Sequence, residues 1–228
     1  MRLSLCLLTW NEAAGCRITV PRLPLGDFDE AFAVDGGSTD GTVEYLEAQG
    51  IPVFRQEAPG YNAAYGCAFR RCSTDALVFY HPKGTIDPAE VLKFRPLFER
   101  GYDLVIASRL AAGARNEEDD RLLKPRKWFV VALGLAASAI WKRRGTAVRD
   151  VLHGFRGMRR EAFFGLPPLA SGLSIDLEMV VRAYRKRLRV VEFPVSENPR
   201  PSGTTHFAAL GTGWQLLRYL AFELRRDG

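Results

Sequence analysis

Four short groups of polar residues stand where chemistry could occur, because each follows an apolar run typical of a buried strand. The groups occupy residues 9–12, 35–40, 81–85 and 108–109. They contain carboxylates such as Glu12 and Asp35, which accept hydrogen bonds, and the cations Lys83 and Arg109, which bind anions. The carboxyl ends of parallel strands meet at one edge of a sheet, where ligands bind, so the four groups predict one site.

The elements that must position these groups alternate along the first half of the chain. We expect strands at 3–8, 31–35, 51–56, 76–81 and 103–109, and helices at 42–50, 60–73 and 87–101. Glycines in GGSTDGT permit a tight turn after the second strand, where Thr39 or Asp40 can cap the next helix. Strands alternating with helices predict an α/β fold, with a mostly parallel central sheet and helices on both faces.

The pattern changes after residue 110. Residues 109–126 are polar and aperiodic, which predicts a mobile loop over the site. An apolar helix follows at 128–141, with basic residues on both flanks. Such flanks and terminal tryptophans are typical of a helix lying in a membrane interface; a buried helix and a dimer contact are the alternatives. The C-terminal half also contains a helix at 174–188, a strand at 189–197 and a last helix with an apolar face: Phe207, Leu210, Trp214, Leu217 and Ala221.

Several classes of protein are excluded. The longest uncharged apolar stretch, 128–141, has 14 residues, whereas a bilayer-spanning helix needs ~20. The N-terminus has no convincing leader cleavage site, so we expect a cytoplasmic protein. The four cysteines form no CxxC pair and are expected to be core thiols.

Charge is unevenly distributed. Residues 1–120 contain 12 Lys and Arg against 18 Asp and Glu, a net −6, and residues 121–228 contain 20 against 8, a net +12. The basic half suggests an anionic partner: a phosphate ligand, nucleic acid or the inner membrane leaflet. Because no recognised nucleic-acid motif is present, we expect no nucleic-acid partner.

Seven motifs in order resemble glycosyltransferase family 2, and within it the dolichyl- or polyprenyl-phosphate glycosyltransferases. They are TWNEA (9–13), VDGGSTDGT (34–42), GTIDP (84–88), ASR (107–109), HGFRGMRREAF (153–163), IDLEMVVRAYRKRLRVVEFPVSE (175–197) and RPSGTT (200–205). The resemblance implies one GT-A domain over 1–228, with a nucleotide-binding part at 1–110 and an acceptor part at 111–228 that contains the apolar helix 128–141.

The resemblance also implies a site for the nucleotide of a sugar donor. Glu12 and Asp35 would accept hydrogen bonds from the base or ribose, because carboxylates accept from ring N–H and hydroxyl groups. The glycines of the turn would let the backbone approach the nucleotide. The alternative for Asp35 and Asp40 is that they only cap the next helix. The full implied set is Thr9, Asn11, Glu12, Asp35, Gly37 and Ser38.

The chain departs from the family at the metal motif. The family ordinarily has Asp-x-Asp there, which holds Mg2+ or Mn2+ against the donor diphosphate. Here His81, Pro82 and Lys83 take those positions, and a protonated lysine binds no metal. We therefore assign no metal ligand. Either Lys83, with His81, Arg109 and Arg200, stabilises the departing diphosphate without metal, or the catalytic apparatus has decayed to leave a nucleotide- or phosphate-binding scaffold. A zinc ion bound by His81 would need further protein ligands, and no other histidine stands at a suitable spacing.

The acceptor implied by the resemblance is a polyprenyl phosphate. A phosphate dianion needs no general base, only cations that hold it in line with the anomeric carbon. The implied phosphate-binding residues are Arg109, Arg126, Arg156, Arg200 and Ser202.

A sugar hydroxyl as acceptor would instead need a base, Asp176 or Glu178. These two lie on different faces of their helix, so we expect at most one in the site and the other paired with Arg182 or another helix neighbour. The implied catalytic residues are Lys83, Arg109, Asp176 and Glu178.

The resemblance thus implies an inverting glycosyltransferase that moves a sugar from a nucleotide-sugar donor to a lipid phosphate. It would work in the cytoplasm, in peripheral contact with the inner membrane face, and a homodimer is one option. The alternative is a non-catalytic GT-A-shaped scaffold.

Overall fold

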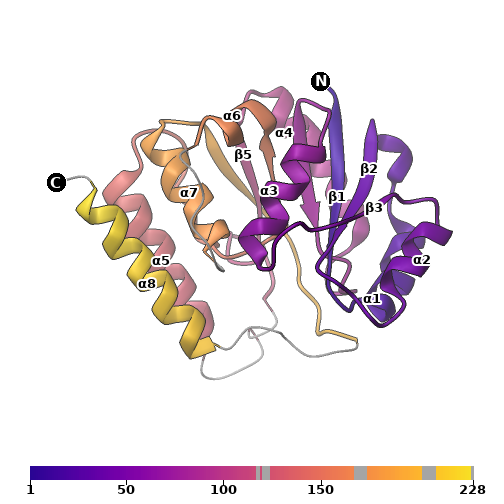
Figure 1. Ribbon diagram of the computed structural model, residues 1–228. Coiled ribbons are helices and arrows are strands. Elements are labelled where there is room, and N and C mark those ends of the chain that lie inside the picture. Colours follow the sequence, from indigo (N-terminus) through magenta and orange to yellow (C-terminus); the bar gives the residue numbers. More distant parts are fainter. Residues whose placement is uncertain (117–118, 120–123, 167–173, 202–208, 227–228) are drawn as a thin grey trace.

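The computed structural model describes residues 1–116, 119, 124–166, 174–201 and 209–226 (Figure 1). Its centre is one seven-stranded sheet in the order β3-β2-β1-β4-β6-β5-β7. The strands are β1 (Leu3–Thr9), β2 (Glu30–Asp35), β3 (Val53–Arg55), β4 (Ala76–Tyr80), β5 (Leu104–Ser108), β6 (Arg156–Arg159) and β7 (Val190–Pro194).

Helices lie on both faces of this sheet (Figure 1). The α-helices are α1 (Ala13–Thr19), α2 (Thr42–Ala48), α3 (Tyr61–Arg71), α4 (Phe94–Glu99), α5 (Pro125–Trp141), α6 (Arg160–Phe164), α7 (Ile175–Arg185) and α8 (Ala209–Arg225). The described residues also form three 3-10 helices, η1 (Val20–Arg22) and η2 (Leu25–Asp27) between α1 and β2, and η3 (Pro88–Lys93) before α4.

Two apolar cores are built by the alternation of side chains along each strand. In β1, Leu3, Leu5 and Leu7 pack in the core that contains α1, α2 and α4, whereas Cys6 and Leu8 pack in the core that contains α3, α5 and α7. The predicted α/β fold with helices on both faces is confirmed. All four cysteines are buried and unpaired, as expected of core thiols.

The register of the parallel strands brings the predicted polar groups together. β1 pairs in parallel with β2 and with β4, and Thr9 lies opposite Asp35. Every parallel strand of the sheet therefore ends at the same edge, which is the lower edge in Figure 1.

The sequence did not predict β6. This strand is antiparallel to both neighbours and lies between β4 and β5. Its sequence is Arg-Gly-Met-Arg, which has no strand period, and it is stabilised by contacts distant in sequence. A Cβ at Gly157 would lie 2.9 Å from the Phe98 ring, so α4 can pack on β6 only at a glycine. The predicted helix at 87–101 is in fact η3 followed by α4.

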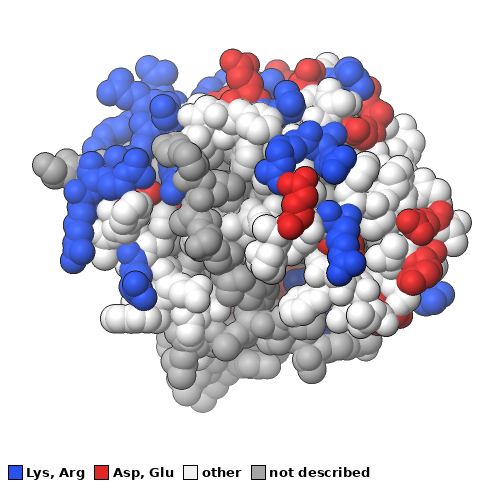
Figure 2. Space-filling model, viewed as in Figure 1, with Lys and Arg blue, Asp and Glu red and all other residues white. Residues whose placement is uncertain are grey.

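The two longest helices, α5 and α8, lie side by side at one end of the molecule (Figure 1). On α8 the predicted apolar face points outward, because Trp214 is 65% exposed and Leu217 is also exposed, while Leu216, Tyr219 and Leu220 pack inward. Phe207 lies outside the described residues. Basic side chains gather where α8 ends (Figure 2, upper left).

Candidate active site

The turn after β2 is built around Asp35. Its carboxylate accepts hydrogen bonds from Gly37 N (2.7 Å), Ser38 N (2.8 Å), Ser38 Oγ (2.5 Å) and Thr9 Oγ1 (3.1 Å). Gly37 has φ +94°, a conformation that glycine adopts without strain. Asp35 is only 2% exposed, so in this conformation it fixes the turn.

The loop after β1 is joined to this turn. Asn11, at φ +53°, donates its backbone N–H to Ser38 Oγ (2.8 Å), and its side-chain oxygen accepts from Thr39 N (2.8 Å). Glu12 N donates to Thr42 Oγ1 (2.9 Å), which ties the same loop to α2. The structure thus brings the six residues of the predicted nucleotide set together at one edge of the sheet.

Asp40 ties the helices that follow these loops. Its carboxylate accepts from Ala13 N (3.0 Å) at the start of α1 and from Thr42 N (3.1 Å) at the start of α2. The N-cap position of α2 is held by Gly41, and Asp40 binds the first backbone N–H of the helix from the position before it.

The segment His81–Pro82–Lys83 follows β4 and lies directly against α1. A Cβ added at Gly15 would lie 2.1 Å from Pro82 O and 3.0 Å from Lys83 Cα. Glycine at position 15 therefore lets the helix and this segment approach closely, which positions the side chain of Lys83.

Lys83 is half-buried. Burial lowers the pKa of its ammonium group below the usual value, and the charges of Arg200 and Arg109 lower it further, against Glu12 and Glu197. The charges of four residues that are far from Lys83 in the sequence thus act on this one lysine.

Arg109, at the end of β5, is held by two carboxylates. It donates Nε and Nη2 to Asp150 (2.9 and 3.0 Å) and Nη1 to Glu197 (3.1 Å). Burial raises the pKa of Asp150, but the Arg109 charge and hydrogen bonds outweigh this effect and bring it to about 2. The guanidinium of Arg109, predicted to bind phosphate, is therefore occupied by the protein's own carboxylates in this conformation.

Arg200 reaches back across the molecule to the nucleotide-binding part. Its Nη2 binds Glu12 Oε1, and it lies in a segment that packs on the loop after β4. Asn198 N donates to Thr85 O (2.7 Å), and Pro201 contacts Gly84 closely enough that a Cβ there would lie 2.9 Å away. Ser202 lies outside the described residues, and of Arg126 only the backbone position in α5 is described.

Tyr61 and Tyr65 of α3 connect His81 with α7. Tyr61 Oη lies 3.2 Å from His81 Nε2 and 3.2 Å from Tyr65 Oη, which lies 3.1 Å from Asp176 Oδ1. Burial lowers the pKa of His81 well below its usual range, and Lys83 lowers it further, so the imidazole is neutral. Neither tyrosine was predicted as a site residue, although their spacing of four on a predicted helix places them on one face.

Asp176 and Glu178 point to different partners. Glu178 is fully buried, and its Oε2 lies 3.0 Å from Arg182 Nη1, so the expected pairing of one of the two with Arg182 is confirmed. Asp176 lies 3.2 Å from Arg156 Nε and 3.1 Å from Tyr65 Oη. Asp176 is thus connected to His81 through Tyr65 and Tyr61.

Arg156 is also fully buried. Its guanidinium donates to the backbone carbonyls of His153 (2.8 Å), Asp176 (2.6 Å) and Val151 (3.2 Å). These contacts direct it into the protein, where it positions the start of α7 instead of facing an acceptor.

A family model for glycosyl transferase family 2 matches residues 4–164. This chain belongs to that family. The match covers the nucleotide set, the His81–Lys83 segment and Arg109, and it confirms the resemblance identified from the motifs.

Two proteins similar in sequence are named as sugar transferases. Glycosyltransferase AglJ of Haloferax volcanii is 27% identical over 210 residues, 88% of this chain and 65% of that protein. Dolichyl-phosphate hexose transferase of the same organism is 27% identical over 175 residues, 77% of this chain and 72% of that protein. This family 2 chain thus spans less than two thirds of the length of AglJ.

Glucosyl-3-phosphoglycerate synthase of Mycobacterium tuberculosis has a similar structure. In complex with Mn2+, UDP-glucose and phosphoglyceric acid, it gives a TM-score of 0.71 at 22% identity, over 96% of this chain and 78% of that one. The likeness confirms the predicted GT-A fold.

The side chains of this family 2 member do not fit the divalent metal that the family ordinarily uses. The motif position offers an ammonium and a single imidazole. Nearby carboxylates already have arginine partners: Glu12 has Arg200, and Glu197 has Arg109. Within the described residues no group of three or more His, Cys, Asp and Glu side chains could hold a metal ion.

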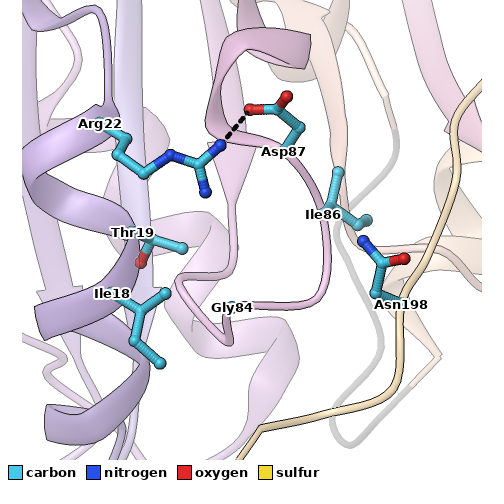
Figure 3. Close-up of a pocket in the computed structure, with 7 residues that line it drawn as sticks. All are labelled: Ile18, Thr19, Arg22, Gly84, Ile86, Asp87 and Asn198. Atoms are coloured by element: carbon cyan, nitrogen blue, oxygen red, sulfur yellow. Dashed lines mark hydrogen bonds and ion pairs between the residues drawn. The ribbon is translucent and has the colours of Figure 1, made fainter.

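A small pocket opens beside the loop after β4, between α1 and the segment that precedes Arg200 (Figure 3). Its volume is about 140 Å³, below the ~300–1,000 Å³ of sites that enclose drug-sized ligands. Arg22 and Asp87 pair across it at 3.1 Å. It is therefore too small for a nucleotide sugar. Its lining residues are Ile18, Thr19, Arg22, Gly84, Ile86, Asp87 and Asn198.

Proposed function

We propose that this chain is an inverting glycosyltransferase that transfers a sugar from a nucleotide-sugar donor to a polyprenyl phosphate without a metal ion. Lys83 replaces the metal by stabilising the departing nucleoside diphosphate, with His81 and Arg200 beside it. Fixed positive charge at a leaving group is an effective form of catalysis, because it needs no reorganisation during the reaction.

The observation that carries this proposal is the position of Lys83. Lys83 lies in the loop after β4, at the strand edge where the predicted nucleotide set lies, and α1 is packed against its backbone through Gly15. Its half-buried surroundings strengthen any attraction to phosphate oxygens, since charges interact more strongly away from water.

The acceptor is proposed from chemistry and from the relatives. Glu178 is bound to Arg182, and Asp176 is buried among Arg156 and the tyrosines, so neither is free to deprotonate a sugar hydroxyl in this conformation. A phosphate dianion needs no base. The name of dolichyl-phosphate hexose transferase supports the same acceptor class.

Contact with a membrane surface is proposed for the outer faces of α5 and α8. Trp128 is 57% exposed on α5, and Trp214 and Leu217 are exposed on α8. Basic side chains at the end of α8 would attract anionic lipids (Figure 2). No helix in the described part of the chain is both long and apolar enough to cross a membrane.

The test of donor binding is calorimetric titration with UDP-sugars and GDP-sugars, each in EDTA and then with Mn2+. We expect micromolar binding in EDTA that is lost in Lys83→Ala and kept in Lys93→Ala, whose side chain is exposed and pairs with Glu90. Transfer to a polyprenyl phosphate in EDTA is then expected.

Other outcomes assign other functions. Binding that appears only with Mn2+ would reject the replacement of metal by Lys83. Binding of a nucleotide sugar without transfer to any acceptor would identify a nucleotide-binding scaffold. No binding of any nucleotide sugar would reject the proposal that this chain is an enzyme.

The membrane contact is tested by co-sedimentation with vesicles of phosphatidylcholine containing phosphatidylglycerol. Replacement of Leu217 and Phe222 by Ser should abolish binding, whereas Leu92→Ser, an exposed site on η3, should leave it unchanged. Binding should weaken as salt is raised. Equal binding by both variants would reject this surface.

A further inference from the structure

A second pocket lies between the ends of α7 and α8 and has a volume of about 270 Å³. The strand that follows α7 is β7, which runs in parallel toward the edge of the sheet that carries the nucleotide set, so α7 ends at the opposite edge (Figure 1). From Asp176 to Lys186 the helix rises roughly 15 Å, at ~1.5 Å per residue. This pocket is therefore separate from the candidate active site. Its lining residues are Arg182, Arg185, Lys186, Glu223 and Arg226.

A buried carboxylate holds the arginines of this pocket in place. Glu223, on α8, is only 1% exposed. It lies 3.4 Å from Arg182 Nε and 3.7 Å from Arg226 Nη1, and it also binds Arg185 Nη1. Tyr219 Oη donates to the same carboxylate (3.1 Å). Three guanidiniums from two helices thus converge on one side chain, which fixes their positions before any ligand arrives.

Among the described residues, positive charge exceeds negative charge around the pocket. Its lining has four cations and one carboxylate, a net +3. Glu178 pairs with Arg182 (3.0 Å) and lowers the net charge to +2. The C-terminal ends of α7 and α8 each act as a charge of about −0.5, which offsets about one more positive charge. A surplus of about one positive charge remains after both offsets, so the pocket favours an anion.

The donors of the pocket suit a phosphate group. A guanidinium has about five N–H donors and a carboxylate about four lone-pair sites, so three guanidiniums offer about 15 donors against about eight sites on Glu178 and Glu223. A phosphomonoester carries a charge of about −1.5 to −2 at pH 7, and arginine meets its acceptor oxygens in pairs. One water molecule needs only about 10–15 Å³, so the pocket has room for a group of that size.

An exposed aromatic ring stands beside the pocket. Phe222, on α8, is 52% exposed, and the Arg226 guanidinium lies 5.6 Å from the centre of its ring. Leu224 on the same helix is also exposed. A phosphate held by Arg226 would therefore lie next to apolar surface, which favours a phosphate that carries an apolar chain over a bare ion.

We propose that this pocket binds a phosphomonoester group. Arg182, Arg185 and Arg226 donate to its oxygens, and Lys186, which is exposed beside them, adds a further positive charge. The group belongs either to a soluble ligand or to the headgroup of a lipid in the membrane surface proposed above. This inference goes beyond the proposed function, because it needs neither Lys83 nor the transfer of a sugar.

Binding is tested by calorimetric titration of the full chain with glycerol 3-phosphate in EDTA at pH 7. We expect binding that is weakened about tenfold or more in Arg185→Gln/Lys186→Gln, because one hydrogen bond to a charged group contributes roughly that factor. The control Arg70→Gln/Arg71→Gln removes the same charge from exposed ion pairs with Glu57 and should bind like the wild type. Equal affinity of the two double variants would overturn the proposal.

A single variant repeats the test at an exposed position. Lys186→Glu changes the charge beside the pocket and leaves the three arginines and Glu223 in place. Its affinity for glycerol 3-phosphate should also fall about tenfold or more, because a cation is replaced by an anion. Unchanged affinity would overturn the proposal even if Arg185→Gln/Lys186→Gln fails to fold.

Lys83→Ala separates this pocket from the candidate active site. The pocket should bind glycerol 3-phosphate in this variant with the affinity of the wild type. Loss of all binding in Lys83→Ala, with unchanged binding in Arg185→Gln/Lys186→Gln, would overturn the pocket and leave the proposed function intact. Undiminished binding of a nucleotide sugar by Lys83→Ala would overturn the proposed function instead.

Vesicles identify the source of the phosphate. Co-sedimentation compares phosphatidylcholine vesicles that contain phosphatidic acid, a phosphomonoester, with vesicles of equal surface charge that contain phosphatidylglycerol, a diester. A preference for phosphatidic acid that is lost in Arg185→Gln/Lys186→Gln would support a lipid headgroup as the ligand. Equal binding to both vesicles, together with binding of glycerol 3-phosphate at the pocket, would support a soluble phosphomonoester. Binding of neither glycerol 3-phosphate nor phosphatidic acid at the pocket would overturn the proposal.

Discussion

Replacement of Gly15 by Ala tests how closely α1 must approach the Lys83 segment. The added Cβ would lie 2.1 Å from Pro82 O, and real Cβ atoms essentially never lie closer than 3.0 Å to another heavy atom. The helix and the segment must therefore separate by at least 0.9 Å. Helix α1 cannot easily move, because Ala13 N is bound to Asp40 and Glu12 N to Thr42.

The expected magnitude follows from two opposing effects. Alanine in place of glycine inside a helix stabilises by roughly 0.5–1 kcal/mol, whereas overpacking of this kind costs about 1–3 kcal/mol or more. Because the obstacle is backbone, we expect a net loss of about 1–2 kcal/mol in the free energy of unfolding. Lys83 would also be displaced, so binding of the nucleotide sugar should weaken.

The control is Gly66→Ala in α3. There the added Cβ would meet only the flexible end of Arg70, at 3.2 Å, so the helix effect should dominate and stabilise by roughly 0.5–1 kcal/mol. Urea unfolding of both variants measures the difference. If Gly15→Ala is as stable as Gly66→Ala, the close approach of α1 does not position Lys83 and our reasoning is refuted.

Two further predictions concern buried charge. Arg182→Met leaves Glu178 without its cation and should lower the free energy of unfolding by roughly 3–5 kcal/mol. The control Arg70→Met, which breaks an exposed ion pair, should lower it by less than about 1 kcal/mol. Equal losses of the two variants in urea unfolding would contradict the prediction for Arg182. Because its folded pKa of about 2 lies below the unfolded value, Asp150 stabilises above about pH 4 and this contribution is lost as the pH falls from 4 to 2. Asp150→Asn leaves Arg109 without its main partner, so this variant should be less stable than the wild type at pH 6 and should lose less stability than the wild type as the pH falls. A pH profile of the urea midpoint that matches the wild type would contradict this account.

Most of the fold was predictable because its signals are local. The strands that became β1, β2, β4 and β5 are short apolar runs that end in polar groups, and alternation with helices requires a parallel sheet. β6 was missed because its stability comes from distant partners. Arg156 is unfavourable in an isolated strand, and its burial is made acceptable by the carbonyls of His153, Val151 and Asp176 and by the carboxylate of Asp176.

The site was predictable in position but less so in the role of each side chain. Motif spacing placed Thr9, Asp35 and Lys83 at one edge of the sheet. It could not reveal that Arg109 binds Asp150 and Glu197, since those three residues are far apart in sequence. A cation's function depends on which carboxylates reach it in the folded chain.

The place of β6 in the sheet has a consequence for how the chain folds. During synthesis β5 is complete long before β6 emerges, yet β4 and β5 do not pair with each other, because β6 lies between them in the sheet. Until residue 159 has been made, β4 presents an open edge, and open edges are where strands of other chains add. A fragment that stops at residue 110 would retain that edge permanently. We therefore expect such a fragment to aggregate, and the two parts of the chain to fold as one late, cooperative unit that depends on contacts distant in sequence.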